Sequence, residues 1–481
     1  MLGGLAAALP GRTILEAVQN GRQAGHHMPP YRDVALVRSG VLPPAPAFAR
    51  PLLIPPVLRP TRRTMTTDYY QVAIKQGQAE VFPGIQTPVL GYEGRFTGPT
   101  IHAHAGRRVV VTQTNSLTEP AAVHLHGGHV PPDSDGHPMD VIAPGSSRTY
   151  VYPNNQLGAT LWYHDHAHHL ESEHVYRGLA GFYLLKDQTE ASLPLPRGGY
   201  DVPLMFRDAQ FDDQGKLLYA NGGFRERTTV LVNGLPQPYF QVKARKYRLR
   251  LLNACNDRDL AFTMANGEFV QIGSDGGLLP APVPTTKVGV WPGERVEVVV
   301  DFSRYPVGSQ VVLVNERGND EATRNVMRFD VVGEAPDFSS VPETLRPLPD
   351  LGEATVTRDV VFKLDLTTGM FLIDGKVFDP ARVDQQVKRG TTEIWRISNP
   401  DTRPAVPHNM HLHLAQFQVL ERNGRPVSGH EAGLKDTVTV LSGGTASFKV
   451  RFEEYTGRYV YHCHLLDHSS MGMMAQMEIT P

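Results

Sequence analysis

The carboxyl-terminal part of the chain concentrates side chains that bind metals. Residues 461–474 read YHCHLLDHSSMGMM, so one cysteine lies between two histidines and is followed by a third histidine and by methionines. A thiolate, imidazoles and a thioether suit a type 1 copper site, which takes two histidines, one cysteine and a weak axial methionine. The segment supplies Cys463, His468 and Met473, so the second histidine must come from elsewhere in the chain.

Strand geometry gives the order His-Cys-His a further meaning. Side chains alternate between the two faces of a strand, so His462 and His464 point one way and Cys463 points the other. The cysteine can bind copper on one face while both histidines bind metal on the opposite face, which makes a short electron route. The alternative is a buried structural cysteine among chance histidines, and the recurrence of histidine motifs elsewhere disfavours it.

Three further histidine motifs occur: His124-Leu-His126, His164-Asp-His166 and His408-Asn-Met-His411-Leu-His413. His411 and His413 share a strand face, whereas His408 lies three residues away and tends to the face of Cys463. We therefore expect His408 to complete the type 1 site. Eight imidazoles remain, which suit a three-metal copper cluster with positions left open for oxygen. They are His124, His126, His164, His166, His411, His413, His462 and His464.

The elements that must position these motifs are predicted to be strands. The 45 glycines and 39 prolines favour a turn-rich β architecture, and 481 residues suggest about three domains. A strand-like unit that ends in asparagine occurs three times, at Asn115, Asn253 and Asn399. The pattern predicts an all-β chain of three consecutive β-sandwich domains.

The repeat and the proline-rich breaks divide the chain. We expect an N-terminal proline-rich extension over residues 1–60 and domains over residues 61–192, 193–340 and 341–481. WYHDH in the first domain parallels VYHCH in the third, with Asp165 where Cys463 stands, so only the third domain can hold a type 1 copper. The middle domain lacks both motifs and is predicted to be a copper-free spacer. The eight histidines come from the first and third domains, so their cluster must lie at the interface.

The N-terminal extension leaves two interpretations open. Residues 13–25 could form a short amphipathic helix, and residues 43–60 are rich in proline and must run extended. That stretch either packs along the protein as a strap or belongs to a disordered leader. The first residues lack a basic region and a clear cleavage site, so they make a poor secretory signal. We expect a cytoplasmic protein or one whose leader has been removed.

Charge and cysteine content limit the partners. The net charge is −2 and no run of about 18 apolar residues occurs, so neither a nucleic-acid partner nor a membrane is implied. With Cys463 assigned to metal, Cys255 has no disulfide partner, and it is expected to be a buried small hydrophobe. The oligomeric state and the natural pathway stay open.

The four motifs resemble those of multicopper oxidases of the laccase type, in the same order and spacing. The wording HLHGG, PPDSDGHP, LWYHDHA, GTTEIWRISNP and GRYVYHCH looks closest to the branch of bacterial spore-coat laccase, bilirubin oxidase and phenoxazinone synthase. The resemblance implies cupredoxin-like Greek-key domains and four copper ions per chain. It implies type 1 ligands His408, Cys463, His468 and Met473, a type 2 pair His124 and His411, and type 3 ligands His126, His164, His166, His413, His462 and His464.

The resemblance also implies a reaction. A reducing substrate gives single electrons near His468, these pass through Cys463 to His462 and His464, and O2 is reduced to water. Asp135 is the expected proton relay, with a plain turn residue as the alternative. Relatives carry a glutamate directly after the last type 1 histidine, but this chain has Ser469, so the second acid of the relay is open and Asp467 is one candidate.

The substrate class is inferred from the length of one link in the third domain. The link between Phe417 and Lys435 is short, from which we expect an open cleft suited to phenols, aminophenols or similar small aromatics. Two alternatives remain: a cuprous oxidase that protects against copper, and a non-catalytic cupredoxin scaffold that has lost its metal. Other histidines are expected to lie outside the copper sites; these are His26, His27, His102, His104, His137, His168, His169, His174 and His430.

Overall fold

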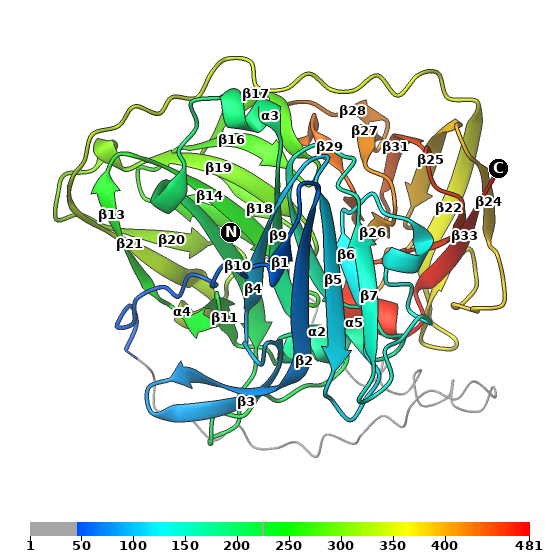
Figure 1. The fold of residues 1–481 in the computed structure, drawn as a ribbon, viewed down its shortest axis with the longest axis horizontal. Helices are drawn as coiled ribbons and strands as arrows, with labels where there is room; N and C mark the ends of the chain where they lie inside the picture. The colour runs from blue at the N-terminus through cyan, green and yellow to red at the C-terminus, as the bar shows by residue number, and fades with distance from the viewer. Residues whose placement is uncertain (1–45, 224–225) are drawn as a thin grey trace, which may run out of the picture.

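Alternating burial along the strands explains why this chain forms sandwiches. In β5 (Arg108–Asn115) every second side chain is buried, and the others are partly or fully exposed. Such a strand covers a core with one face and meets water or a neighbouring segment with the other. The computed structural model describes residues 46–223 and 226–481, and Figure 1 shows three such sandwiches side by side. The chain is therefore an all-β protein, as predicted.

The first sandwich has two sheets, β1-β2-β5-β7 with β3 beside β2, and β4-β9-β8-β6. Its other elements are β1 (Arg62–Arg63), β2 (Thr67–Phe82), β3 (Ile85–Tyr92), β4 (Gly98–His104), β6 (Val123–His126), β7 (Ser147–Tyr152), β8 (Ala159–Asp165), α2 (Glu171–Arg177), β9 (Ala180–Lys186) and α3 (Gln188–Ser192).

The second sandwich has the sheets β12-β11-β10-β14-β19-β16-β17 and β13-β21-β20-β15-β18. Its elements are β10 (Asp201–Ala209), β11 (Thr229–Val232), β12 (Leu235–Pro236), β13 (Tyr239–Ala244), β14 (Lys246–Asn253), β15 (Leu260–Met264), β16 (Phe269–Ser274), β17 (Gly277–Thr285), β18 (Val288–Val290), β19 (Arg295–Asp301), β20 (Gln310–Asn315), α4 (Glu321–Arg324) and β21 (Asn325–Glu334).

The third sandwich has the sheets β23-β22-β25-β31-β27-β28, with β29 beside β27, and β24-β33-β32-β26-β30. Its elements are β22 (Val356–Asp365), β23 (Met370–Ile373), β24 (Gln385–Lys388), β25 (Thr392–Ser398), β26 (His408–Leu412), β27 (Phe417–Arg422), β28 (Arg425–Pro426), β29 (Leu434–Lys435), β30 (Thr437–Val440), β31 (Thr445–Arg451), β32 (Gly457–Cys463), α5 (Leu466–Ser470) and β33 (Met474–Thr480).

The repeated asparagines perform the same structural task in each sandwich. Asn115 donates its side-chain amide to two carbonyls, and its oxygen accepts from the backbone N–H two residues on. Asn253 and Asn399 make the same three bonds in their own sandwiches. In each sandwich, one asparagine side chain thus stabilises the turn that follows a central strand. The sequence repeat therefore marks the three domains.

The segments between the sandwiches run extended over their surfaces. Residues 46–60 bond the second sandwich at Tyr239 and the first at Thr100, as expected for a strap. Residues 335–355 lie along the top of Figure 1 between the second and third sandwiches. The predicted boundary near residue 193 follows α3, and that near residue 341 falls within this second connection. The predicted helix over residues 13–25 lies outside the described residues.

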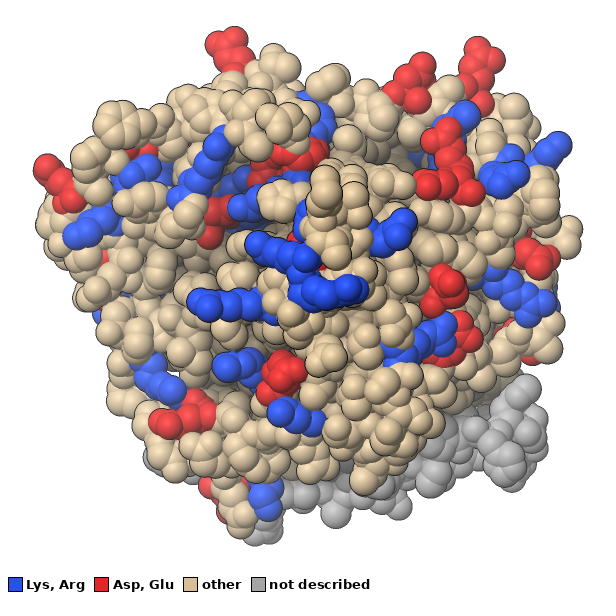
Figure 2. Space-filling model, in the orientation of Figure 1, with Lys and Arg blue, Asp and Glu red and all other residues tan. Residues whose placement is uncertain are grey.

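In the view of Figure 2, acidic and basic side chains are interspersed, so this face of the protein is neither wholly acidic nor wholly basic. Several Lys and Arg side chains gather near its centre. In the described ranges, none of the helices has the length and the apolar character that crossing a membrane requires.

Candidate copper centres

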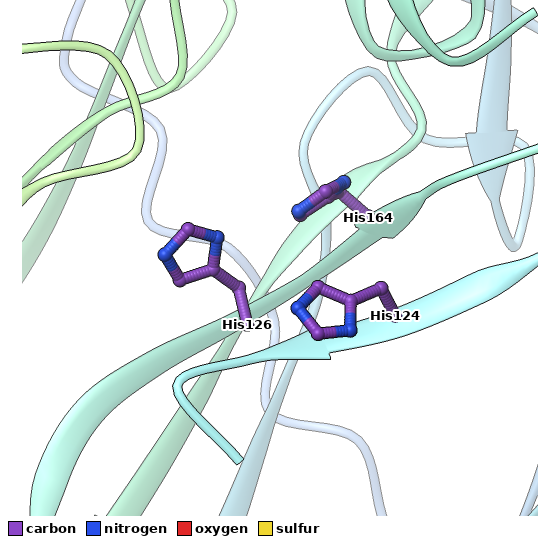
Figure 3. Close-up of side chains that lie close together, drawn as sticks. All are labelled: His124, His126 and His164. Atoms are coloured by element: carbon purple, nitrogen blue, oxygen red, sulfur yellow. The ribbon is translucent and has the colours of Figure 1, made fainter. Parts of the chain in front are cut away.

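Neighbouring strands of the first sandwich bring three histidines together. β6 pairs with β8 so that His124 lies opposite His164, and His126 follows on the same face as His124. Figure 3 shows the three rings turned toward one another. One ring nitrogen of each lies within 4.8 Å of the others, which is the separation expected of ligands that share a metal.

The third sandwich presents a matching pair of strands. β26 pairs with β32, so that His411 lies opposite His462 and Met410 opposite Cys463. The two sandwiches meet at these histidines: Nε2 of His411 lies 3.4 Å from Nε2 of His124, and Nε2 of His462 lies 3.2 Å from Nε2 of His166. His413 approaches His462 at 3.3 Å. The eight predicted histidines therefore converge at one interface, all of them buried.

Backbone carbonyls fix the orientation of several rings. Nδ1 of His124 lies 2.7 Å from the carbonyl of Asp135, and Nδ1 of His411 lies 2.8 Å from that of Asp436. The corresponding nitrogen of His462 lies 2.9 Å from the Cys463 carbonyl. A ring that donates one nitrogen to a carbonyl presents the other as a lone pair, which is how proteins orient metal-binding histidines.

The buried nitrogens that remain fit copper. Nδ1 of His126, Nε2 of His164, Nδ1 of His166 and both nitrogens of His464 have no hydrogen-bond partner among the described residues. Such orphaned polar atoms are costly unless something binds them. Burial and the neighbouring imidazoles hold the pKa of His164, His166 and His464 well below its usual range, so these rings are neutral and ready to bind metal.

A second group lies on the other face of β32. Sγ of Cys463 lies 3.6 Å from Nδ1 of His468 and 3.9 Å from Nδ1 of His408, as strand alternation predicts. Met473 is buried in the same core cluster, and its carbonyl accepts a hydrogen bond from the Cys463 N–H. Burial raises the pKa of the Cys463 thiol to about 12. A bound cation is what would hold it as a thiolate.

Asp135 contacts histidines of both sandwiches. Its Oδ2 lies 2.8 Å from Nδ1 of His413, and its Oδ1 lies 3.5 Å from Nδ1 of His124. The carboxylate is fully buried. This position is compatible with the predicted relay and differs from that of a plain turn residue, which would face solvent. The relay itself stays a prediction.

The second sandwich takes part in the site, which the sequence reasoning missed. Arg295 begins β19 and donates to both carboxylate oxygens of Asp436, at 2.7 and 2.5 Å. Asp436 in turn lies 2.9 Å from Nε2 of His126. Gly293 has φ +83°, and a Cβ there would come within 2.8 Å of the His464 ring. The description of this domain as a spacer is therefore too simple. The only sequence signal for this contact was a single acid, Asp436, between Lys435 and Thr437.

The surroundings of Asp467 and Ser469 bear on the second acid of the predicted relay, which stays open. Asp467 accepts hydrogen bonds from Arg227 Nη2 at 2.7 Å, from Ser172 and from the Gly222 N–H, so its oxygens are bound to groups of the first and second sandwiches. Ser469 instead donates its hydroxyl to Glu171, a buried residue of α2 that the sequence analysis did not single out.

The histidines expected to lie outside the clusters do so where they are described. His102 and His104 lie on β4, and His137 contacts Gln476. His174 contacts two acidic side chains, since it lies 3.0 Å from Asp165 and 3.3 Å from Glu119. Cys255 is buried in the core of the second sandwich, as predicted. His26 and His27 lie outside the described residues.

The open cleft expected from the short link between Phe417 and Lys435 stays a prediction. This link contacts the second sandwich, where the His430 carbonyl accepts from Gln271 and the Leu434 carbonyl accepts from Ser274. The neighbour that bears on access to His468 is Phe371, whose ring stacks on the imidazole with centroids 3.8 Å apart.

Comparisons with known proteins give the family of this chain. Multicopper oxidase family models match residues 73–190, 205–334 and 345–481. A laccase of Bacillus stratosphericus is 36% identical, covering 90% of this chain and 99% of the relative. The bilirubin oxidase of Albifimbria verrucaria is also 36% identical, covering 92% and 82%. The solved laccase of Pediococcus acidilactici aligns with a TM-score of 0.86 at 33% identity, covering 92% and 95%.

The chain belongs to the multicopper oxidase family, with three cupredoxin-like Greek-key domains. Among these enzymes it is a laccase-like, copper-dependent oxidoreductase that passes electrons from a reducing substrate to O2.

Proposed function

We propose that the protein oxidises phenolic or aminophenolic aromatics by single electrons beside His468 and reduces O2 to water among the eight interface histidines. Bound copper supplies the electron transfer and the oxygen chemistry: one type 1 ion held by His408, Cys463, His468 and Met473, a type 2 ion held by His124 and His411, and two type 3 ions held by His126, His164, His166, His413, His462 and His464.

The observation that carries the proposal is the arrangement around β32. Cys463 faces His408 and His468, while His462 on the opposite face contacts His166 and His413. Three consecutive residues at the end of β32, His462, Cys463 and His464, therefore join the substrate side to the oxygen side by covalent bonds. A site built for metal storage alone would not need this connection.

The surroundings of His468 support an aromatic substrate. His468 keeps part of its surface accessible, and Phe371 covers one face of its ring. A flat aromatic can meet the accessible part of the imidazole with the same kind of stacking contact that Phe371 makes. Asp135 supports the proton side of the proposal, because its buried carboxylate lies between the two sets of histidines, 2.8 Å from His413 and 3.5 Å from His124.

The methionines near the carboxyl end bear on the alternative of a cuprous oxidase. Met473, Met474 and Met477 are fully buried in core clusters, and Met471 is partly buried against one of these clusters. Their thioethers therefore fill the core and do not offer a surface site for Cu(I).

Oxygen uptake by copper-loaded protein tests the proposal, with o-aminophenol, a simple methoxyphenol and Cu(I) compared side by side. Copper-free protein is the control. Fast turnover of the two aromatics is expected. Turnover of Cu(I) alone would replace the proposal with copper detoxification, and protein that binds no copper would indicate a non-catalytic scaffold.

A further inference from the structure

Glu171 is a buried carboxyl group with an unusual place in the molecule. It opens α2 in the first sandwich, five residues after His166, and its side chain is fully buried. Its Oε1 accepts a hydrogen bond from Ser469 Oγ at 3.1 Å, and Ser469 lies five residues after His464 in the third sandwich. The carboxyl thus lies where the two segments that leave the histidine cluster meet again.

No ion pair to this carboxyl is found among the described residues, since the nearby His174 pairs with Asp165 and Glu119 instead. Oε2 of Glu171 has no hydrogen-bond partner in the part of the chain that the structure describes. Burial, with a smaller contribution from Asp165 on β8, raises the pKa of Glu171 to about 8 against the lowering effects of its backbone hydrogen bond, Ser469 and His174. A carboxyl in such a place carries a proton at neutral pH and can release it to a stronger base. A purely structural glutamate would be expected to have a cationic partner.

The competing candidate is the acid nearest in sequence, Asp467. That carboxylate accepts hydrogen bonds from the Arg227 guanidinium, the Gly222 N–H and Ser172. Its lone pairs are therefore committed to groups of the first and second sandwiches. Glu171 has one committed oxygen and one free one, which makes it the better proton carrier.

We propose that Glu171 supplies protons for the reduction of O2, in place of an acid at position 469. The inference rests on the proposed oxidase function. Reduction of one O2 to two waters takes four electrons from the reducing substrate and four protons from solvent. In each transfer the Glu171 O–H bond breaks toward the oxygen being reduced, and the carboxylate is then reprotonated from solvent.

The first test is Glu171→Gln, which keeps the shape and removes the proton. Oxygen uptake at saturating aromatic substrate is expected to fall by ~100-fold, the lower end of the usual range for acid–base groups. Copper content and the visible absorption of the type 1 site should stay unchanged. Anaerobic reduction of that absorption by substrate should keep its rate, while its return on mixing with O2 should slow. Glu173→Gln is the matched control, because Glu173 lies on the same helix and is paired with Arg177 near the surface.

A second readout does not depend on turnover. The C=O stretch of a protonated carboxylic acid, identified in the infrared spectrum by its shift in D2O, should be present at neutral pH. Glu171→Gln should lose this band and Glu173→Gln should retain it. A spectrum in which Glu171→Gln changes nothing would contradict the proton-carrying state of Glu171.

Moving the acid separates a chemical role from a structural one. Because the two side chains touch, Glu171→Ser combined with Ser469→Glu returns a carboxyl beside a hydroxyl at the same place. This double variant is expected to recover at least ~10-fold over Glu171→Ser. If Glu171→Gln fails to load copper, the double variant still tests whether the carboxyl has a chemical role. Wild-type rates in Glu171→Gln, or no recovery in a copper-loaded double variant, would overturn the inference while leaving the oxidase function standing. Failure of the wild type to consume O2 would overturn both.

Discussion

Cys463 is the single residue on which the proposed chemistry depends most. It is fully buried, lies beside His408 and His468, and is flanked by two histidines that face the other cluster. Each of these relations follows from residue type and strand parity, so the sequence was enough to predict them. The neighbouring groups that tune the cysteine, such as the Asn409 N–H at 3.4 Å from its sulfur, were not predictable because they depend on strand register.

Replacing this thiol should abolish one site and leave the other. Cys463→Ser is expected to remove the type 1 absorption and lower aromatic-driven oxygen uptake by more than ~100-fold, since changes outside the ligand set alone cost 10–100-fold. Copper analysis should show one ion lost per chain. Cys255→Ser is the control, because that thiol lies in the core of the second sandwich. Retained absorption in Cys463→Ser would refute the assignment.

His174 provides a pH-dependent prediction. Burial lowers its pKa, but Asp165 and Glu119 outweigh that effect and raise the pKa to about 10. A raised pKa stabilises the folded state fully below the ordinary histidine value, and this contribution fades as the pH rises through about 10. His174→Leu should therefore lower the unfolding midpoint more at pH 6 than at pH 10. Equal shifts at both pH values, measured by calorimetry, would show that the charge is not involved.

At the scale of elements, paired strands with the pattern His-x-His build the cluster. β6 with β8 and β26 with β32 use the same antiparallel pairing in two sandwiches. The period of two along a strand made the ligand faces predictable from sequence. The turn before β19 was not predictable, because nothing in Trp-Pro-Gly-Glu-Arg shows that it packs against a histidine of another domain.

That turn yields a prediction about Gly293. Alanine there incurs the left-handed backbone cost of about 1–2 kcal/mol and also places a Cβ 2.8 Å from the His464 ring. Gly293→Ala should lose copper from the histidine cluster while keeping the type 1 absorption. Gly308→Ala carries similar backbone strain at φ +95° with nothing within 4 Å, and should keep all its copper. Equal copper content in the two variants would argue against this contact.

At the scale of the whole molecule, all three sandwiches contribute to one site. Arg295 of the second sandwich donates to Asp436 of the third and to the Thr160 carbonyl of the first. These residues are far apart in sequence and share no motif. The repeat along the chain was enough to predict three domains and their order. The role of the middle domain was not predictable, because it depends on how the three domains pack.

Removing this central cation should destabilise the assembly. Arg295→Met leaves the Asp436 carboxylate buried without its partner, a change that typically costs about 3–5 kcal/mol. We expect a lower unfolding midpoint and loss of copper from the cluster. Arg304→Met removes an exposed ion pair with Glu268 and should change neither quantity. An unchanged midpoint in Arg295→Met would mean that the domains are held together elsewhere.

The most direct test of the central claim is the stoichiometry of oxygen uptake by copper-loaded protein with a one-electron methoxyphenol substrate, before and after addition of catalase. Complete reduction to water predicts four substrate molecules oxidised per O2 and no oxygen returned by catalase. Two substrate molecules per O2, with oxygen returned by catalase, would show that reduction stops at hydrogen peroxide and would contradict the account.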